Sequence, residues 1–237
     1  MEEGKPRKLL RFKLEDKLII PYGFKNKWDI NKLKIVGVDD KATYFESELP
    51  CFCLDKLNTP RLSILDINSI TTLDVFDDQH GYADTAEMLL ILKYLQDKCE
   101  TEHERQFLKH YFDYFMYTPG ISFSHDALLP VPQAHLYFKD PLTEDEDTFV
   151  SQKSNRVDFL FWNGEKIIIV EIDGDGPSHA EGNSIAHEHI IKDRKFQHVG
   201  VQIIHILNKE IDEIGIEVID RLLPIDILGR APIKRED

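Results

Sequence analysis

The chain has 237 residues, of which 42% are hydrophobic and 30% are charged, so it has room for one large domain or two small ones and is not mainly disordered. No apolar stretch reaches the roughly 18–20 residues that span a bilayer, and three cysteines are too few for a disulfide framework, so we expect no membrane segment and a cytoplasmic protein. The net charge of −14 argues against a chain that binds nucleic acid over its whole surface, although residues 1–41 hold 11 Lys and Arg against 7 Asp and Glu.

Short strands separated by turn formers are expected throughout residues 1–80. Near the start of the chain, apolar residues such as Leu10 and Phe12 alternate with charged ones. Cys51 and Cys53 have no second cysteine pair, so we interpret them as strand residues rather than as zinc ligands. The polar stretch 77–81 predicts a boundary between a small β-rich N-terminal domain of unknown role (1–80) and a second domain (81–237). Strands are expected here near 10–14, 33–38, 44–45, 51–54, 61–65 and 70–75.

The period of the apolar residues becomes helical between residues 84 and 117. The polar stretch 97–103 predicts two helices rather than one. Thr101, followed three residues later by Glu104, has the pattern of a capping box that begins the second helix.

The rest of the chain alternates between strands and helices. Asn163-Gly164 predicts a hairpin between two strands, and Gly200 and Asn208 are expected to end one helix and to cap another. The expected strands are 128–138, 156–162, 166–173 and 201–207, and the expected helices are 184–198 and 208–223.

Two carboxylates mark the ends of the paired strands. Asp158 lies near the start of the first strand, and Glu171 ends the second after a run of β-branched residues. In a hairpin that turns at 163–164, these two residues meet at the same end of the sheet. With the backbone carbonyl of Ile172, they offer the hard oxygen ligands that suit Mg²⁺ or Mn²⁺.

The same stretch resembles the PD-(D/E)XK nuclease superfamily, and most closely its branch related to the very-short-patch-repair endonucleases. The likeness runs from about residue 104 to residue 207. It implies an α/β fold with a restriction endonuclease-like core, in which a mixed sheet flanked by helices follows the order α-β-β-β-α-β. The matching motifs are Arg156-Val157-Asp158-Phe159, Glu171-Ile172-Asp173-Gly174, His179, Asp193-Arg194 and Gly200-Val201-Gln202-Ile203-Ile204.

The resemblance also implies roles for single residues. Asp158 and Glu171 would bind the metal ion together with the carbonyl of Ile172. Glu104, on the helix before the sheet, would touch the metal ion or its waters. His179 would act as general base or acid on the attacking water.

One position departs from the superfamily pattern. Two residues after Glu171, where the superfamily usually has Lys, this chain has Asp173. Either Asp173 is a regular member of the catalytic site, with His179 taking over the role of the lysine, or Lys192 or Lys195 reaches the site from the next helix. The third alternative is a site that has lost its activity.

Each of these residues also has an ordinary structural reading. Asp158 could be a turn or cap residue, Glu104 only a capping-box residue, and His179 only a loop residue. Asp173 and Asp175 could form a plain acidic turn, since no calcium-loop ligand pattern continues after them. His187-Glu188-His189 lacks the spacing of a zinc motif and is interpreted as a helix surface.

The sequence therefore predicts a divalent-metal-dependent endonuclease that hydrolyses phosphodiester bonds in DNA, in a restriction, defence or repair context. The alternative is a catalytically weak or partner-dependent subunit with the nuclease fold, which would act with a protein partner or as a homodimer. A third hypothesis is a metallohydrolase that acts on a small phosphorylated molecule.

Overall fold

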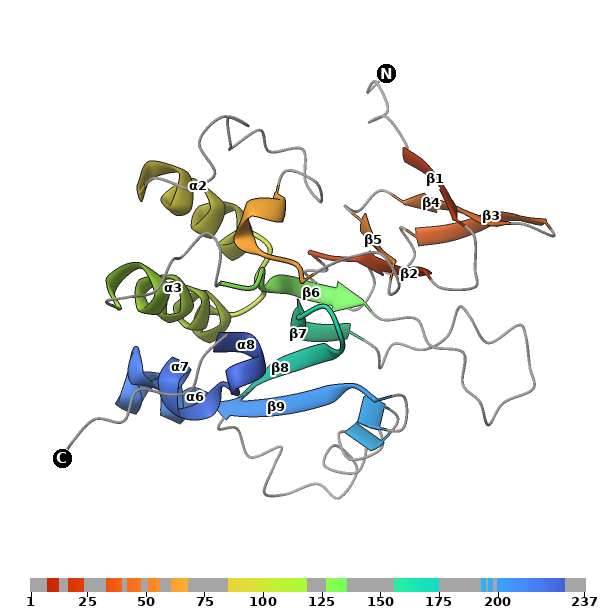
Figure 1. The fold of residues 1–237 in the computed structure, drawn as a ribbon. Coiled ribbons are helices and arrows are strands. Elements are labelled where there is room, and N and C mark those ends of the chain that lie inside the picture. Colours follow the sequence, from red (N-terminus) through yellow and green to blue (C-terminus); the bar gives the residue numbers. More distant parts are fainter. Residues whose placement is uncertain are drawn as a thin grey trace.

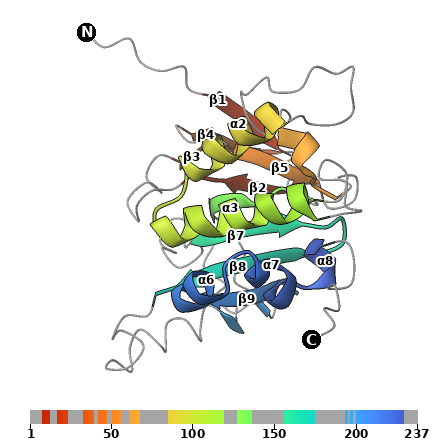
Figure 2. The same ribbon diagram turned by 90° about the vertical axis from the view of Figure 1, so that its left-hand side faces the viewer.

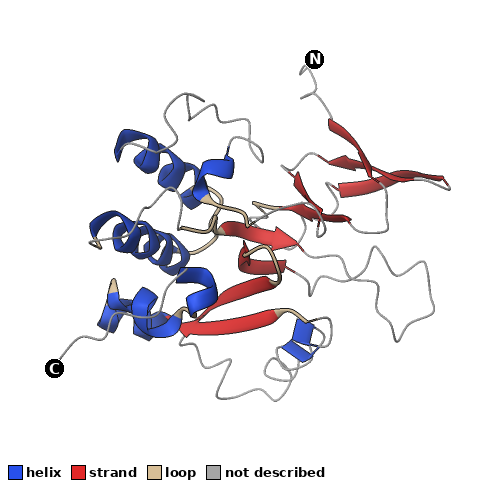
Figure 3. Cartoon of the chain, viewed as in Figure 1, coloured by secondary structure: helices blue, strands red, loops and turns tan. Residues whose placement is uncertain are grey.

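The computed structural model shows a mixed α/β fold built around a four-stranded mixed sheet, with helices stacked on one face of it (Figures 1 and 3). This confirms the α/β class expected from the sequence. The structure describes residues 8–12, 17–23, 33–39, 42–47, 51–55, 61–67, 85–118, 127–135, 156–174, 193–194, 196–197 and 200–228.

The central sheet has the strand order β6-β7-β8-β9. Strand β7 (Arg156–Trp162) pairs antiparallel with β6 (Val131–His135) on one side and with β8 (Ile167–Asp173) on the other, whereas β9 (Gln202–Leu207) runs parallel to β8. All four strands were expected from the sequence. The parallel pairing of β8 with β9 requires a crossover connection, which the intervening residues provide.

The hairpin between β7 and β8 turns where Asn163-Gly164 predicted it, but it uses a four-residue loop. Trp162 pairs with Ile167, and Asn163 Oδ1 accepts hydrogen bonds of 2.9 Å from the backbone N–H groups of Glu165 and Lys166. Gly164 has a φ of 98°, a conformation that side chains with a Cβ disfavour. The Asx-type contact and the glycine together close the turn.

Two long helices precede the central sheet, α2 (Thr85–Gln96) and α3 (Glu102–Tyr117), as the break at 97–103 predicted; α2 packs against α3, and α3 covers one face of the sheet. The ring of Phe107 lies 5.0 Å from that of Phe159, and the ring of Tyr111 lies 5.6 Å from that of Phe161. Figure 2 shows α3 crossing this face together with the C-terminal helices. The apolar face of α3 therefore packs directly on β7.

The C-terminal part was expected to form one helix over 208–223, capped by Asn208, and this was wrong. The chain forms α6 (Asn208–Ile214), α7 (Glu217–Leu222) and α8 (Ile225–Leu228). Gly215, with a φ of 60°, separates the first two. Asn208 lies inside α6, because the helix begins after Leu207, whose N–H donates to Glu210 Oε2 over 2.8 Å.

The N-terminal part is rich in strands, as predicted. Its described strands form a three-stranded sheet, β1-β4-β3, and a two-stranded sheet, β2-β5. The strand expected over 61–65 is absent from that described stretch: Ser63 makes one isolated bridge to Leu128, and a 3₁₀ turn, η2 (Ile64–Asp66), follows. The strand expected over 70–75 lies outside the described residues. The strands are β1 (Lys8–Phe12), β2 (Lys17–Pro21), β3 (Leu33–Asp39), β4 (Ala42–Ser47) and β5 (Cys51–Asp55).

Residues on both sides of the expected domain boundary share one core. Ile20, Tyr22 and Ile64 are fully buried in the same cluster as the apolar residues of α2, α3 and the central sheet. The Gly23 N–H donates to the carbonyl of Pro132, at β6, over 3.1 Å. The boundary stretch 77–81 itself lies outside the described residues.

Two further expectations concern helices. Of the helix expected over 184–198, only residues 193–194 and 196–197 are described, and these four are helical. Among the described residues, no helix combines the length and apolar character needed to cross a membrane.

Candidate functional site

Three polar residues form a row across neighbouring strands of the central sheet. The β7–β8 register pairs Phe159 with Val170, so continuing it by one residue places Asp158 opposite Glu171. The β8–β9 register pairs Glu171 with His205. Paired residues of neighbouring strands share a face of the sheet. This register places the two carboxylates at the same end of the hairpin, and their convergence on one ion stays a prediction.

The side of the sheet on which this row lies follows from strand alternation. The ring of Phe159 packs on α3. Because successive side chains of a strand point to opposite faces of the sheet, Asp158 is on the face away from α3. On β8, Ile172 packs against the core. Its two neighbours along the strand, Glu171 and Asp173, are therefore on the opposite face. The row therefore lies on the face that α3 does not cover.

Asp158 is held by contacts at both carboxylate oxygens. Its Oδ2 accepts a hydrogen bond of 2.8 Å from the backbone N–H of Ile172, and its Oδ1 lies 3.4 Å from Nε2 of Gln133. The first contact ties the start of β7 to the end of β8. It fixes the position of the carboxylate next to Glu171.

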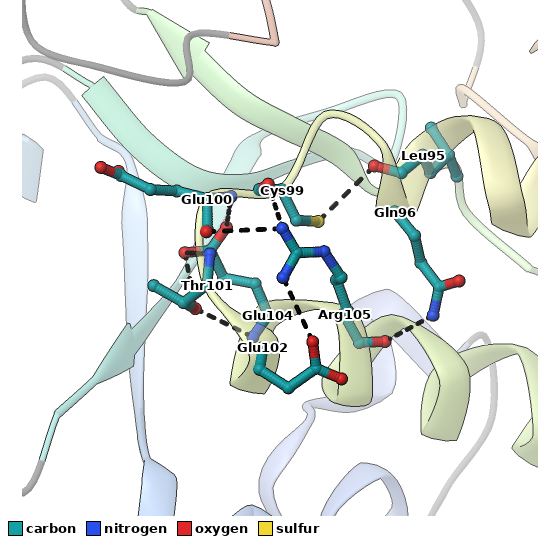
Figure 4. A network of polar contacts seen from close by, with 8 residues as sticks. All are labelled: Leu95, Gln96, Cys99, Glu100, Thr101, Glu102, Glu104 and Arg105. Atoms are coloured by element: carbon teal, nitrogen blue, oxygen red, sulfur yellow. Dashed lines mark hydrogen bonds and ion pairs between the residues drawn. The ribbon is translucent and has the colours of Figure 1, made fainter.

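Glu104 lies in the capping box that the sequence predicted for α3 (Figure 4). Its Oε1 accepts from the backbone N–H of Thr101 at 3.2 Å and from the hydroxyl of Thr101 at 2.9 Å. Its Oε2 accepts from the N–H of Glu100 at 2.9 Å and from Nε2 of Gln133 at 2.7 Å. The side chain is 2% exposed. With four donors on its two oxygens, Glu104 acts here as a structural anchor, and its link toward Asp158 runs through Gln133.

Sequence reasoning missed Gln133, which lies in β6 between Glu104 and Asp158. It is fully buried, has a φ of 49°, and no described residue donates a hydrogen bond to its Oε1. The signal that could have indicated it is a lone amide in the otherwise apolar run from Leu128 to Ala134.

A second polar group surrounds His205, which was also missed. Its Nδ1 lies 2.7 Å from Asp173 Oδ2, and its Nε2 lies 3.1 Å from Asp193 Oδ2. The hydrogen bond to Asp173 is the main cause that raises the pKa of His205 to about 9, with the charge of Asp193 adding to it and partial burial opposing it. Ionised carboxylates only accept hydrogen bonds, so with a pKa of about 9 the ring donates from both nitrogens and is a cation at neutral pH. A histidine within the apolar run from Ile203 to Ile206 was the available signal.

An ion pair fixes the loop before α3 to the start of β7. Arg156 Nη2 lies 2.6 Å from Glu100 Oε2, and both side chains are partly exposed. Because Arg156 precedes Asp158 by two residues, this contact helps to set where the N-terminal end of α3 meets the sheet.

Other predicted site residues cannot be placed. His179, Lys192 and Lys195 lie outside the described residues. Within the described part of the chain, no group of three or more His, Cys, Asp or Glu side chains is arranged to hold a metal ion. The pair Asp158 and Glu171 nevertheless fits the donor set of Mg²⁺, which proteins hold through one or two carboxylates while substrate phosphates and waters complete its coordination.

We compared the chain with protein-family models, with curated proteins and with solved structures, and none of the three comparisons found a match.

Proposed function

We propose that this protein is a divalent-metal-dependent endonuclease that hydrolyses phosphodiester bonds in DNA. The observation that carries the proposal is the β7–β8 register, which pairs Phe159 with Val170 and, continued by one residue, sets Asp158 opposite Glu171 at the end of the hairpin. Two carboxylates brought together on neighbouring strand ends are a suitable anchor for a hard divalent cation. The choice of DNA as substrate follows the sequence resemblance.

The order of the elements supports the same proposal. Helix α3 precedes three antiparallel strands, and after a connection a fourth strand joins the sheet in parallel. This order supports the proposed α-β-β-β-α-β core, in which a helix would precede β9; of the residues there the structure describes four, and these are helical. The proposed nuclease core therefore comprises α3 and the central sheet.

In this proposal, Asp158 and Glu171 hold Mg²⁺ or Mn²⁺, with the carbonyl of Ile172 as a further oxygen ligand. When bound there, such an ion would supply charge neutralisation at a phosphate and would acidify a water. Asp158 keeps its place because Ile172 donates to it. His179 remains the proposed proton acceptor for the attacking water.

The aspartate that replaces the usual lysine also has a place in this proposal. Asp173 lies on the same face as Glu171 and binds His205, whose ring carries a positive charge. A cation therefore lies beside the metal-binding end of β8, although it comes from β9 and both of its N–H groups are engaged by carboxylates. Lys192 and Lys195 remain candidates for a direct contact with the phosphate.

The test is plasmid cleavage by the purified protein in Mg²⁺, in Mn²⁺ and in EDTA. We expect metal-dependent nicking that falls at least about 100-fold in Glu171→Gln, because one of the two metal-binding carboxylates is lost. Glu165→Gln is the matched control, since it makes the same change in an exposed residue at the far end of the same hairpin. Equal rates in the wild type and Glu171→Gln would contradict the proposal.

Absence of cleavage by the wild-type protein in every metal would favour a partner-dependent subunit with the same core. Hydrolysis of nucleotides without cleavage of polynucleotides would indicate a small-molecule metallohydrolase. Either result would replace the endonuclease proposal.

A further inference from the structure

We propose that Gln133 is a positioning residue that orients the Asp158 carboxylate for metal binding by linking it to Glu104. The inference deepens the proposed function and rests on it, because it concerns the same metal site. The contacts run from the α3 cap, through the buried amide of Gln133, to the carboxylate of Asp158.

The hydrogen bonds fix the orientation of the amide. Nε2 of Gln133 lies 2.7 Å from Glu104 Oε2 and 3.4 Å from Asp158 Oδ1, so its two N–H groups face two carboxylates. The flipped amide would set its oxygen against both of them and lose both contacts. Gln133 can therefore serve this link in one orientation only.

Glu104 gives the amide a rigid support. Three of the four donors on its carboxylate come from Thr101 and Glu100, in the turn that begins α3. The short bond holds the amide to this turn, and the longer one reaches Asp158. Loss of the amide would leave Asp158 Oδ1 without this contact, while Oδ2 would still accept from Ile172.

Two features of Gln133 oppose stability, although its hydrogen bond to Glu104 supports it. Its Oε1 is buried with no donor among the described residues, and its backbone has a φ of 49°, which residues other than glycine seldom adopt. Both features lower stability, and a strained, incompletely bonded residue between two carboxylates is typical of a functional site.

The experiment measures Mn²⁺ binding directly by electron paramagnetic resonance, without any cleavage. Wild type, Glu171→Gln and Gln133→Met are titrated with Mn²⁺, and circular dichroism checks that each is folded. We expect Gln133→Met to raise the Kd for Mn²⁺ about tenfold. Gln96→Met is the matched control with an unchanged Kd, because it removes a comparable amide that donates 2.9 Å to the Arg105 carbonyl, on the other side of the α3 cap.

If Gln133 acts by positioning Asp158, the effect of Gln133→Met on Mn²⁺ affinity must depend on the Asp158 carboxylate. In the Asp158→Asn background, Gln133→Met should change the remaining affinity by less than about twofold, because the group that it positions is already altered. If Gln133→Met does not fold, Gln133→Leu takes its place with the same expected results.

The possible failures are separable. If Mn²⁺ binding depends on Glu171 but Gln133→Met keeps the wild-type Kd, the inference is overturned and the proposed function stands. If no Mn²⁺ binding depends on Glu171, the metal site itself is overturned, and the inference falls with it. If Gln133→Met weakens Mn²⁺ binding but the wild type cleaves no DNA, the positioning role is supported and the endonuclease activity is not.

Discussion

At the scale of single residues, the charged side chains of the candidate site come from different strands and contact one another. Asp173 stands where a nuclease of the resembled superfamily usually has a lysine, and it holds the ring of His205 from the neighbouring strand. Asp193 contacts the other ring nitrogen, so the segment before β9 is attached to the sheet through the same imidazole. The positive charge beside Glu171 therefore depends on tertiary contacts.

This arrangement predicts a pH dependence of stability. The pKa of His205 is raised to about 9 in the folded protein, from an ordinary value of 6.5. A raised pKa means that the folded state binds the proton more tightly, so the stabilisation is complete below pH 6.5 and is lost as the pH rises through 9. Because the side chain is 35% exposed, solvent screening limits the effect to on the order of 1 kcal/mol.

Urea unfolding between pH 6 and pH 9.5 checks this prediction. The free energy of unfolding should fall over that range in the wild type and fall less in His205→Gln. His103→Gln is the control, since it removes a histidine that contacts a single carboxylate, Asp212, over 3.3 Å. Identical pH profiles for the wild type and His205→Gln would contradict the prediction.

At the scale of elements, the start of α3 has two roles, because the Glu104 carboxylate that closes the capping box also contacts Gln133. Thr101→Ala removes the hydroxyl that accepts from the Glu104 N–H and donates to Glu104 Oε1. Loss of an N-cap of this kind costs about 1 kcal/mol, with a range of roughly 0.5–2 kcal/mol. We expect this loss in urea unfolding and expect Thr101→Ser to restore most of it. A Thr101→Ala protein as stable as the wild type would show that the cap contributes nothing.

The elements also show what the sequence could and could not predict. The existence and place of the β7–β8 hairpin were predictable from Asn163-Gly164, whereas its register follows from the four-residue loop, which shifts the pairing by two residues and so keeps each side chain on the expected face. The capping box of α3 was predictable for the same local reason. The single helix expected over 208–223 failed at Gly215, where local signals of helix continuation and interruption compete.

The missed residues belong to pairings that no local turn controls. Gln133 meets Asp158 because β6 pairs with β7 across a connection of about 20 residues, and His205 meets Glu171 through a parallel crossover. The register of such pairings is set by how the whole sheet packs. The sequence could therefore indicate the two carboxylates, but not the amide and the imidazole that surround them.

At the scale of the whole molecule, the part before residue 80 and the central sheet are joined by packing. The hydroxyl groups of Tyr22 and Tyr94 lie 3.2 Å apart, and the N–H of Leu62 donates to the carbonyl of Trp162 over 3.0 Å. Ile64 is fully buried in the shared core. These contacts join the N-terminal part to α2 and to the hairpin that carries the candidate site.

Shared packing predicts shared unfolding. Ile64→Ala removes buried apolar volume and should lower the free energy of unfolding by about 2–5 kcal/mol. If the core is one cooperative unit, the same loss appears in the urea transition of the central sheet. Trp162 fluorescence follows that transition, and Trp28→Phe removes the other tryptophan. Leu89→Ala is the control of similar size, since Leu89 is 53% exposed on α2. A Trp162 transition that Ile64→Ala leaves unmoved would show that residues 1–80 fold as a separate domain, as the sequence alone suggested.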